Sequence, residues 1–547
     1  MRKEKEKKRQ VKESFMQGVF AMMFSQVLIK LIGLIYKLYL TNREGFGDEG
    51  NAIYSSGFYI YSLLLTLSSV GIPNAISKLV SARIAIGDNK GANRIFKIAF
   101  FTFGLLGFIG TCILFFGAHY IANFIIQIPE AELTLVALSP SIFFVALICV
   151  IRGYFNGNGT LKVTANSQTL EQIFKAVFTI LLVEIVAIAM GLNTAVMAAG
   201  ANLATTVATI GSFIYLFVFY KNNRTLNVNA TGVITQKESI WKVIKSILYV
   251  SIPISLSAIL SSISKNIDST TVVRGLKTFM DENAAKIQYG ILSGKVDTLT
   301  SLPLSFNIAF ATALVPALSY ARAKKDMSTA NKRVSFSILV TILIGLPCTA
   351  GMFVFAEPIL KLLFPAQSSG AFLLQISSLA IIFTVLAQTI NGALQGIGKV
   401  MIPALAFTVG VIAKFIINIT LVPIPQIGVN GAAIGTIACN IIACFIGFTV
   451  LKKNMDIKFQ FSKYILKPIL ATAMMSICSY AIYIVLLKIV SLRIAAVIAI
   501  ALAVVIYVLS VISLKVFTKE EIYMIPYGQK VYKVLVRLGI YKEEKVA

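Results

Sequence analysis

Long apolar runs recur along almost the whole chain, and they constrain its fold more than any other feature. One of them, SQVLIKLIGLIYKLYL, occupies residues 25–40. A helix of about 20 apolar residues crosses the hydrocarbon core of a bilayer, where backbone groups find no water to bond. Composition agrees, because 57% of the residues are hydrophobic, 13% are charged and the mean hydropathy is +0.83. These values exclude an ordinary soluble globular protein.

We therefore predict an all-α integral membrane protein with about fourteen transmembrane helices. The expected spans are 15–41, 51–82, 94–118, 133–151, 164–189, 194–220, 247–273, 288–321, 334–356, 371–397, 401–423, 428–451, 464–487 and 491–517. The N-terminal run MRKEKEKKRQVKE is charged, and no cleavage site follows a short apolar core. We expect the first helix to be retained rather than removed as a signal peptide.

The basic excess of the chain indicates membrane topology. The formal net charge is +27, and the basic residues gather in both tails and in alternate loops such as ARIAIGDNKGANRIFK, YKNNR and ARAKKD. The intervening loops, such as TNREGFGDEGN and PIPQIGVN, are acidic or nearly uncharged. This pattern follows the positive-inside rule and predicts a multi-pass plasma-membrane protein with both termini in the cytoplasm. No nucleic-acid partner is expected.

Motifs for catalysis, metal binding or ATP binding are missing from the sequence. The cysteines Cys112, Cys149, Cys348, Cys439, Cys444 and Cys478 all lie in apolar spans without paired spacing, which favours packing roles. His119 is the single histidine and has no Cys/His cluster near it. Walker and HExxH motifs are also lacking, so we expect no enzyme activity, no cofactor, no metal and no ATP-driven pumping.

The chain contains an internal repeat. Residues 155–183 align without a gap on residues 394–422, which pairs Gly157 with Gly396, Gly159 with Gly398 and Lys175 with Lys414. Each copy holds six expected spans, and an even number keeps both copies in the same orientation. We predict two pseudo-symmetric six-helix lobes that face each other, plus two C-terminal helices. Such lobes suit alternating access, although duplication can also build a scaffold without moving parts.

The repeat sets the expected domain organisation. The predicted parts are a basic cytoplasmic tail (1–14), an N-lobe (15–221), a cytoplasmic connecting loop (222–246), a C-lobe (247–452), two additional helices (463–517) and a cytoplasmic tail (518–547).

Charged residues inside the spans point to a ligand. The lysines are Lys30, Lys37, Lys78, Lys175, Lys265, Lys295 and Lys414, and the acids are Glu171, Glu184, Asp268 and Asp297. Each costs about 2.5–3.5 kcal/mol at the bilayer centre, so most must face water or one another. Lys30 and Lys37 share one helix face and have no acid at helical spacing. Because the excess is positive, we expect a cavity that binds an anion.

The other charged residues leave alternatives open. Glu171 and Lys175 stand four residues apart with the acid first, which favours an internal ion pair. Lys265 and Asp268 can pair in the same way or bind ligand. Lys295 and Asp297 are two residues apart, so at most one faces a cavity. Lys78 lies near a span end and can extend its ammonium to the interface.

Three segments carry a family resemblance: IYSLLLTLSSVGIPNAISKLVSAR, YGILSGKVDTLTSLPLSFNIAFATALVPALSYA and NGALQGIGK. They resemble the polysaccharide-exporter branch of the multidrug/oligosaccharidyl-lipid/polysaccharide superfamily, whose SpoVB/YtgP-like group includes MurJ-type lipid II flippases. The resemblance implies a V-shaped fold with a cationic cavity between helices 1, 2, 7 and 8, and a groove near helices 13 and 14 for a polyprenyl tail. It assigns Lys30 and Lys37 to the basic positions around the first-helix glycine, and Asp297 to the acid of helix 8. The chain departs from Gram-negative MurJ proteins at Thr298, where they carry arginine, and at Leu65, where they carry a basic residue.

The favoured function is a flippase that moves an undecaprenyl-diphosphate-linked precursor, lipid II above all, from the inner to the outer leaflet. Another lipid-linked polysaccharide unit (teichoic, capsular, exopolysaccharide or spore cortex) is the main alternative, and a cation-coupled drug antiporter is a third. A membrane scaffold for wall-synthesis enzymes is the non-transport alternative. The expected partners are the lipid-linked oligosaccharide, membrane lipid and cell-wall synthesis proteins, around a monomer. The predicted substrate-binding residues are Lys30, Lys37, Lys78, Lys265, Asp268, Lys295 and Asp297.

Overall fold

The computed structural model describes residues 25, 28–69, 71–223, 239–323, 326–399, 401–457, 460–524, 528–537 and 541. Nearly all of these residues are helical, and no strand occurs among them. Eleven helices in this part of the chain are long and apolar enough to cross a membrane. The prediction of an all-α, multi-pass membrane protein is confirmed.

The helices follow the expected spans closely. The first covers residues 28–42. The later ones are α2 (Gly47–Ser69), α3 (Gly71–Ala85), α4 (Asn89–Tyr120), η1 (Ile121–Ile126), α5 (Ala131–Gly157), α6 (Leu161–Met190), α7 (Thr194–Asn223), α8 (Ile240–Leu276), α9 (Glu282–Gly290), η3 (Ile291–Val296), α10 (Asp297–Ala323), α11 (Met327–Val354), α12 (Ala356–Leu363), α13 (Ala371–Gly396), α14 (Met401–Leu421), α15 (Asn430–Asn454), η4 (Ser462–Leu466), α16 (Lys467–Leu486), α17 (Leu492–Ser513), α18 (Lys519–Met524) and α19 (Gly528–Arg537).

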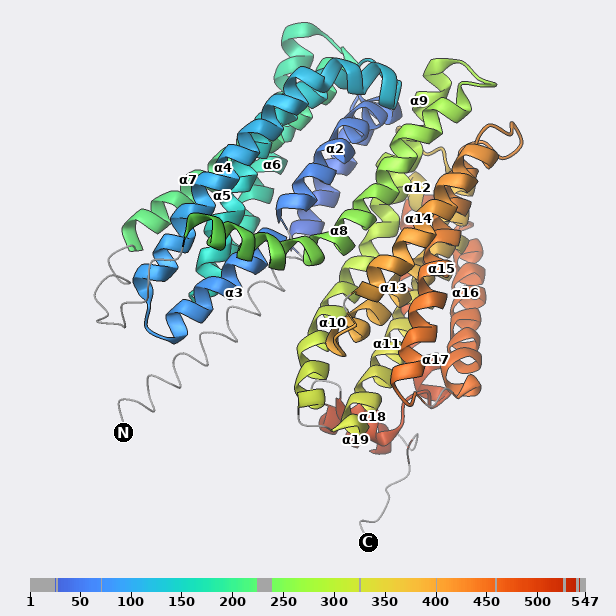
Figure 1. Ribbon diagram of the computed structural model, residues 1–547. Coiled ribbons are helices and arrows are strands. Elements are labelled where there is room, and N and C mark those ends of the chain that lie inside the picture. The colour runs from blue at the N-terminus through green and yellow to red at the C-terminus, as the bar shows by residue number, and fades with distance from the viewer. Residues whose placement is uncertain are drawn as a thin grey trace. The chain divides into compact units, whose positions relative to one another are not determined.

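The helices pack into two compact units. Unit 1 contains residues 1–305 and 407–435, and unit 2 contains residues 306–406 and 436–547. In unit 1, α5 packs against α2, α3, α4 and α7, and α6 runs alongside α7 (Figure 1). Within α5, 72% of the most apolar window is buried, which suits a helix that is apolar on every side. This arrangement makes α5 the centre of unit 1.

Two features of unit 1 place the site described below. The long helix α8 packs against α2 and α3. The π-helical turn η3, between α9 and α10, lies against α2, where a side-chain carbon added to Gly290 or Gly294 would collide with Asp48 or Asn51. At Gly290 the collision is with the Asp48 backbone, so only glycine lets the two backbones come so close there. α10 begins directly after η3, at Asp297.

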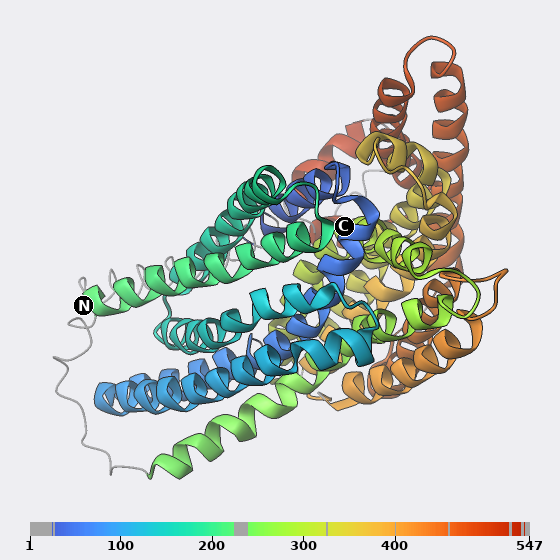
Figure 2. The ribbon, with the colours of Figure 1, turned by 90° about the horizontal axis from the view of Figure 1, so that it is seen from above.

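Unit 2 has its own apolar core. It includes Leu318, Val334, Leu339, Leu394 and Leu451. α11 packs against α13 and α16, and α16 and α17 form an antiparallel pair that is visible in both views (Figures 1 and 2). α18 packs against α19 after the last span.

Both copies of the repeat build the same local structure. Gly157 ends α5 against Ser77 and Val80 of α3, and Gly396 ends α13 against Val315 and Leu318 of α10. Two residues later, Gly159 and Gly398 have φ of +78° and +83°, a left-handed conformation that favours glycine. The glycine pairs of the sequence repeat therefore have matching roles.

The packing units do not follow the predicted lobe boundaries. The expected N-lobe ends at residue 221. In the structure, α8, α9 and residues 407–435, which hold most of α14 and the start of α15, group with the N-terminal half. The N-terminal tail (1–14) lies outside the described residues, as does most of the connecting loop. The two-lobe organisation stays a prediction from the repeat.

Candidate functional site

A cavity of about 270 Å³ lies inside unit 1, where six helical elements meet: the helix over residues 28–42, α2, α6, α8, η3 and α10. The helix over residues 28–42 contributes Lys30 and Lys37, and α8 contributes Lys265. α2 supplies Tyr54, Ser55, Phe58 and Tyr59, α6 supplies Gln172 and Lys175, and α10 supplies Asp297 and Thr298. Four of the seven intramembrane lysines therefore line a single cavity.

Lys37 rests on the aromatic wall of this cavity. Its Nζ lies 4.3 Å from the centre of the Tyr54 ring and 3.5 Å from the Ser55 hydroxyl oxygen. Tyr54 and Phe58 stack with their ring centres 5.8 Å apart, one helical turn from each other on α2. An ammonium over a ring face is stabilised by the ring quadrupole, and the ring carries no charge that would neutralise it. Lys37 therefore remains able to attract an anion.

Lys265 and Asp297 form the only ion pair among the described lining residues. Their Nζ and Oδ2 atoms are 3.8 Å apart, and the Tyr59 hydroxyl donates a 2.8 Å hydrogen bond to the same carboxylate. The Asn266 amide in turn donates to the Tyr59 carbonyl oxygen at 3.0 Å, which ties α8 to α2. Asp297 is thus held beside Lys265 by a bonded framework, and Lys265 pairs with Asp297 rather than with Asp268.

Lys175 also lines the cavity, which the sequence analysis did not expect. The expected Glu171–Lys175 pair does not form, because Arg152 of α5 donates to Glu171 at 2.7 Å. Lys175 is 7% exposed and has no ion pair among the described residues. Its Nζ lies 4.1 Å from the Phe58 ring centre and 5.6 Å from that of Tyr36. The sequence analysis did not identify Arg152 as the partner of Glu171, because the two residues lie on different helices and helical spacing cannot relate them.

The cavity is strongly cationic as a result. Lys30, Lys37, Lys175 and Lys265 place four ammonium groups around a single carboxylate, Asp297. Lys30 is exposed and forms no hydrogen bond or ion pair among the described residues. Attraction between an anion and these groups is stronger here than in bulk water because the surrounding protein has a lower dielectric constant. The arrangement suits a ligand with more than one negative charge.

The other predicted site residues lie elsewhere. Lys295 and Asp48 form a 2.8 Å ion pair whose side chains are 0% and 2% exposed, on the α2–η3 contact. Asp268 accepts hydrogen bonds from Lys414 at 2.6 Å and from Asn418 at 2.9 Å, both on α14. Lys78 is exposed on α3 and does not line the cavity. None of these three predicted residues is brought to the cavity.

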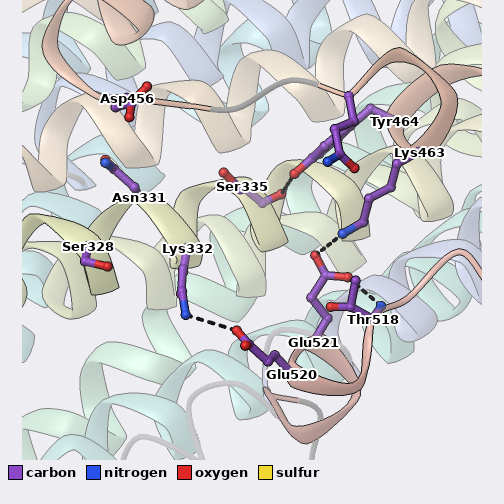
Figure 3. A pocket seen from close by; sticks show the side chains of 11 residues that line it. Ser328, Asn331, Lys332, Ser335, Asp456, Lys463, Tyr464, Thr518, Glu520 and Glu521 are labelled. Atoms are coloured by element: carbon purple, nitrogen blue, oxygen red, sulfur yellow. Dashed lines mark hydrogen bonds and ion pairs between the residues drawn. The ribbon is translucent and has the colours of Figure 1, made fainter.

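A second cavity, of about 550 Å³, lies in unit 2 and has a different character (Figure 3). Its lysines are already paired: Lys332 of α11 contacts Glu520 at 3.0 Å, and Lys463 of η4 contacts Glu521 at 2.6 Å. The two carboxylates belong to α18 and link it to the ends of two other helices. This cavity offers mixed charge rather than a cationic surface.

A metal ion in a protein is held by several His, Cys, Asp or Glu side chains that converge on it. No group of three or more such side chains converges among the described residues. His119 contacts Glu132 at 2.8 Å on an exposed surface, and all six cysteines are free.

Comparison with known proteins supports the resemblance found in the sequence. A family model described as "Polysaccharide biosynthesis protein" matches residues 15–322, and one described as "MatE" matches residues 294–420. Stage V sporulation protein B of Bacillus subtilis is 25% identical, over 86% of this chain and 89% of its own. Lipid II flippase MurJ of the same organism is 22% identical, over 81% and 84%.

Solved structures share the fold. A lipid II flippase MurJ in an inward closed conformation superposes with a TM-score of 0.69 at 17% identity, covering 90% of this chain and 98% of that one. An inward-facing multidrug resistance MATE transporter gives 0.64 at 18% identity, over 79% and 94%. The predicted resemblance to this superfamily is confirmed, and the likeness of these structures concerns the fold alone.

Proposed function

The chain belongs to the polysaccharide biosynthesis protein family, and from this premise we propose that it is a flippase for an undecaprenyl-diphosphate-linked cell-wall precursor. Lipid II is the favoured cargo. The observation that carries the proposal is the cavity in which Lys30, Lys37, Lys175 and Lys265 surround one acid, Asp297. Each charge buried within the membrane lowers stability. A cluster of four lysines is therefore not explained by a structural role.

The cavity chemistry fits the head group of such a lipid. A diphosphate diester carries two negative charges at neutral pH, and ammonium groups bind phosphate oxygens by charge-assisted hydrogen bonds. The aromatic side chains of Tyr36, Tyr54, Phe58 and Tyr59 add apolar faces on which sugar rings can rest. The polyprenyl tail stays in the bilayer while the head crosses.

The direction of transport follows from the membrane potential. We propose that the head group enters from the inner leaflet, on the side where the charge pattern predicts both termini. An inside-negative potential then favours outward movement of an anion by about 2.3 kcal/mol per charge per 100 mV. Alternating access by the two repeat-related lobes is the mechanism we propose.

The proposal is tested in proteoliposomes that contain purified protein and fluorescent lipid II. The wild type is expected to move the lipid between leaflets, as measured by its accessibility to a membrane-impermeant quencher. Lys37→Gln and Lys265→Gln are expected to abolish transport at equal protein content. Lys361→Gln serves as the control, because Lys361 pairs with Glu357 on the unit 2 surface. Normal transport by both cavity variants would contradict the proposal.

A second candidate cargo is another lipid-linked polysaccharide unit, which shares the diphosphate and the tail. Its specific support is the family model described as "Polysaccharide biosynthesis protein", which matches residues 15–322. The same liposome assay with a teichoic-acid or capsular lipid precursor separates the two cargoes. A drug antiporter is disfavoured because the net positive cavity repels cationic drugs.

A further inference from the structure

The positive charge of Lys175 is not compensated by an acid among the described residues. The Lys175 side chain is buried. Burying a charge without a counter-charge is costly, so a lone buried ammonium is rarely kept for stability. The acid one helical turn before Lys175, Glu171, pairs with Arg152 instead.

Lys175 and Lys37 lie close to the same pair of stacked rings on α2. The Nζ of Lys175 lies over Phe58, and the Nζ of Lys37 lies over Tyr54, the ring stacked on Phe58. The two ammonium groups therefore stand over neighbouring rings of α2. Asp297, the single acid of the lining, instead contacts Lys265 and Tyr59. The cavity thus has one region with its own acid and one region without.

We propose that Lys175 and Lys37 form an anion subsite, distinct from the Lys265–Asp297 region, that binds one of the two charged groups of a dianionic ligand. The other charged group binds at Lys265 and Lys30. This inference rests on the proposed function and deepens it, because it makes the cavity selective for ligands with two anionic groups over ligands with one. The stacked rings of Tyr54 and Phe58 form the floor of the subsite, and neither ammonium group forms an ion pair with an acid among the described residues.

The subsite is tested with soluble probes that carry the two charge types. The probes are dimethyl diphosphate, with two charges, and dimethyl phosphate, with one, titrated calorimetrically into the full-length protein in nanodiscs. The wild type is expected to prefer the diphosphate. Lys175→Gln is expected to reduce that preference on the order of tenfold to a hundredfold, the scale of one charge-assisted hydrogen bond, with little change for dimethyl phosphate.

Two variants separate binding from folding. Lys175→Arg keeps the positive charge and is expected to restore much of the preference. Lys332→Gln, in unit 2, is expected to leave both affinities unchanged. Thermal unfolding of each variant identifies any folding defect. A folded Lys175→Gln protein with the wild-type preference would overturn the subsite, and so would a wild type that has no preference.

Failure of the subsite and failure of the proposed function give different results. If the wild type transports lipid II and Lys175→Gln keeps the diphosphate preference, the subsite is wrong and the flippase proposal stands. If the wild type transports no lipid-linked precursor but loses its diphosphate preference on Lys175→Gln, the subsite stands and the cargo is wrong.

Discussion

Lys175 and Lys414 occupy equivalent positions in the two copies of the repeat, yet their surroundings differ. Lys414 donates to Asp268 at 2.6 Å and to the Ser264 carbonyl oxygen at 2.8 Å. Lys175 lies over the rings of Phe58 and Tyr36 and forms no ion pair with any residue that the structure describes. Both side chains are buried, at 1% and 7% exposure for Lys414 and Lys175. Lys414 therefore forms an ion pair in one copy, whereas the Lys175 ammonium lines a cavity in the other.

The comparison shows how a duplicated fold can acquire a site on one side only. The same lysine on the same helix is structural where an acid faces it and available to a ligand where aromatic rings face it. Charge alone does not distinguish the two roles. The partner that faces each lysine distinguishes them. The first three predictions below change such a partner or the lysine itself, and the fourth changes a pair in the other cavity.

The largest expected effect is the loss of the paired lysine. Lys414→Ala leaves the Asp268 carboxylate buried with Asn418 and without its cation. Breaking a buried pair in this way is expected to reduce the free energy of unfolding by about 3–5 kcal/mol. The measurement is thermal unfolding in detergent micelles. The double variant Asp268→Asn/Lys414→Met should recover most of the loss, and a single variant as stable as the wild type would contradict the assignment.

The next effect comes from making Lys175 resemble Lys414. Gln172 lines the cavity three residues before Lys175, and Gln172→Glu adds a carboxylate with almost no change in shape. The new acid is expected to neutralise Lys175 and to slow lipid transport about tenfold or more, the equivalent of one charge-assisted hydrogen bond. Transport in proteoliposomes measures this effect, with Gln172→Met as the uncharged control. Equal rates for both variants would show that the charge on Lys175 is not used.

A smaller effect is expected from the aromatic floor. Phe58→Leu keeps an apolar side chain but removes the ring beneath the Lys175 ammonium. A cation–π contact contributes about 0.5–2 kcal/mol, so diphosphate affinity should fall by a factor between roughly 2 and 30. Calorimetric titration with dimethyl diphosphate measures the change. Phe58→Tyr keeps the ring and should bind like the wild type, so an equal loss in both variants would count against the ring contact.

The smallest effect is expected at the other cavity. Lys332 and Glu520 pair with side chains that are 58% and 72% exposed. Exposed pairs of this kind contribute about 0–1 kcal/mol, so Lys332→Gln should hardly change the unfolding temperature or the transport rate. A loss of transport comparable to that of Lys37→Gln would assign the second cavity a role that its paired charges do not suggest.

The structure brings together some of the residues that the sequence analysis selected as substrate-binding, and their role stays a prediction. Lys30, Lys37, Lys265 and Asp297 were selected from intramembrane charges and from the family resemblance, and all four line one cavity. Lys78, Asp268 and Lys295 were selected by the same reasoning and lie elsewhere. Lys175 was expected to pair with Glu171, but in the structure Glu171 forms an ion pair with Arg152. Local spacing cannot identify such partners, because each of them comes from another helix.

The amino-acid sequence by itself determined the class, the helices and the repeat of this protein. Apolar length sets the spans, because a backbone in lipid must satisfy its hydrogen bonds within each helix. The repeat pairs Gly159 with Gly398, and both adopt a positive φ that favours glycine, so the sequence marks two equivalent turns. The tertiary structure decided which lysines are paired, because a partner's identity depends on the face that a neighbouring helix presents. Asp268 faces Lys414 and Phe58 faces Lys175, so the same residue type completes an ion pair in one copy and lines a cationic cavity in the other.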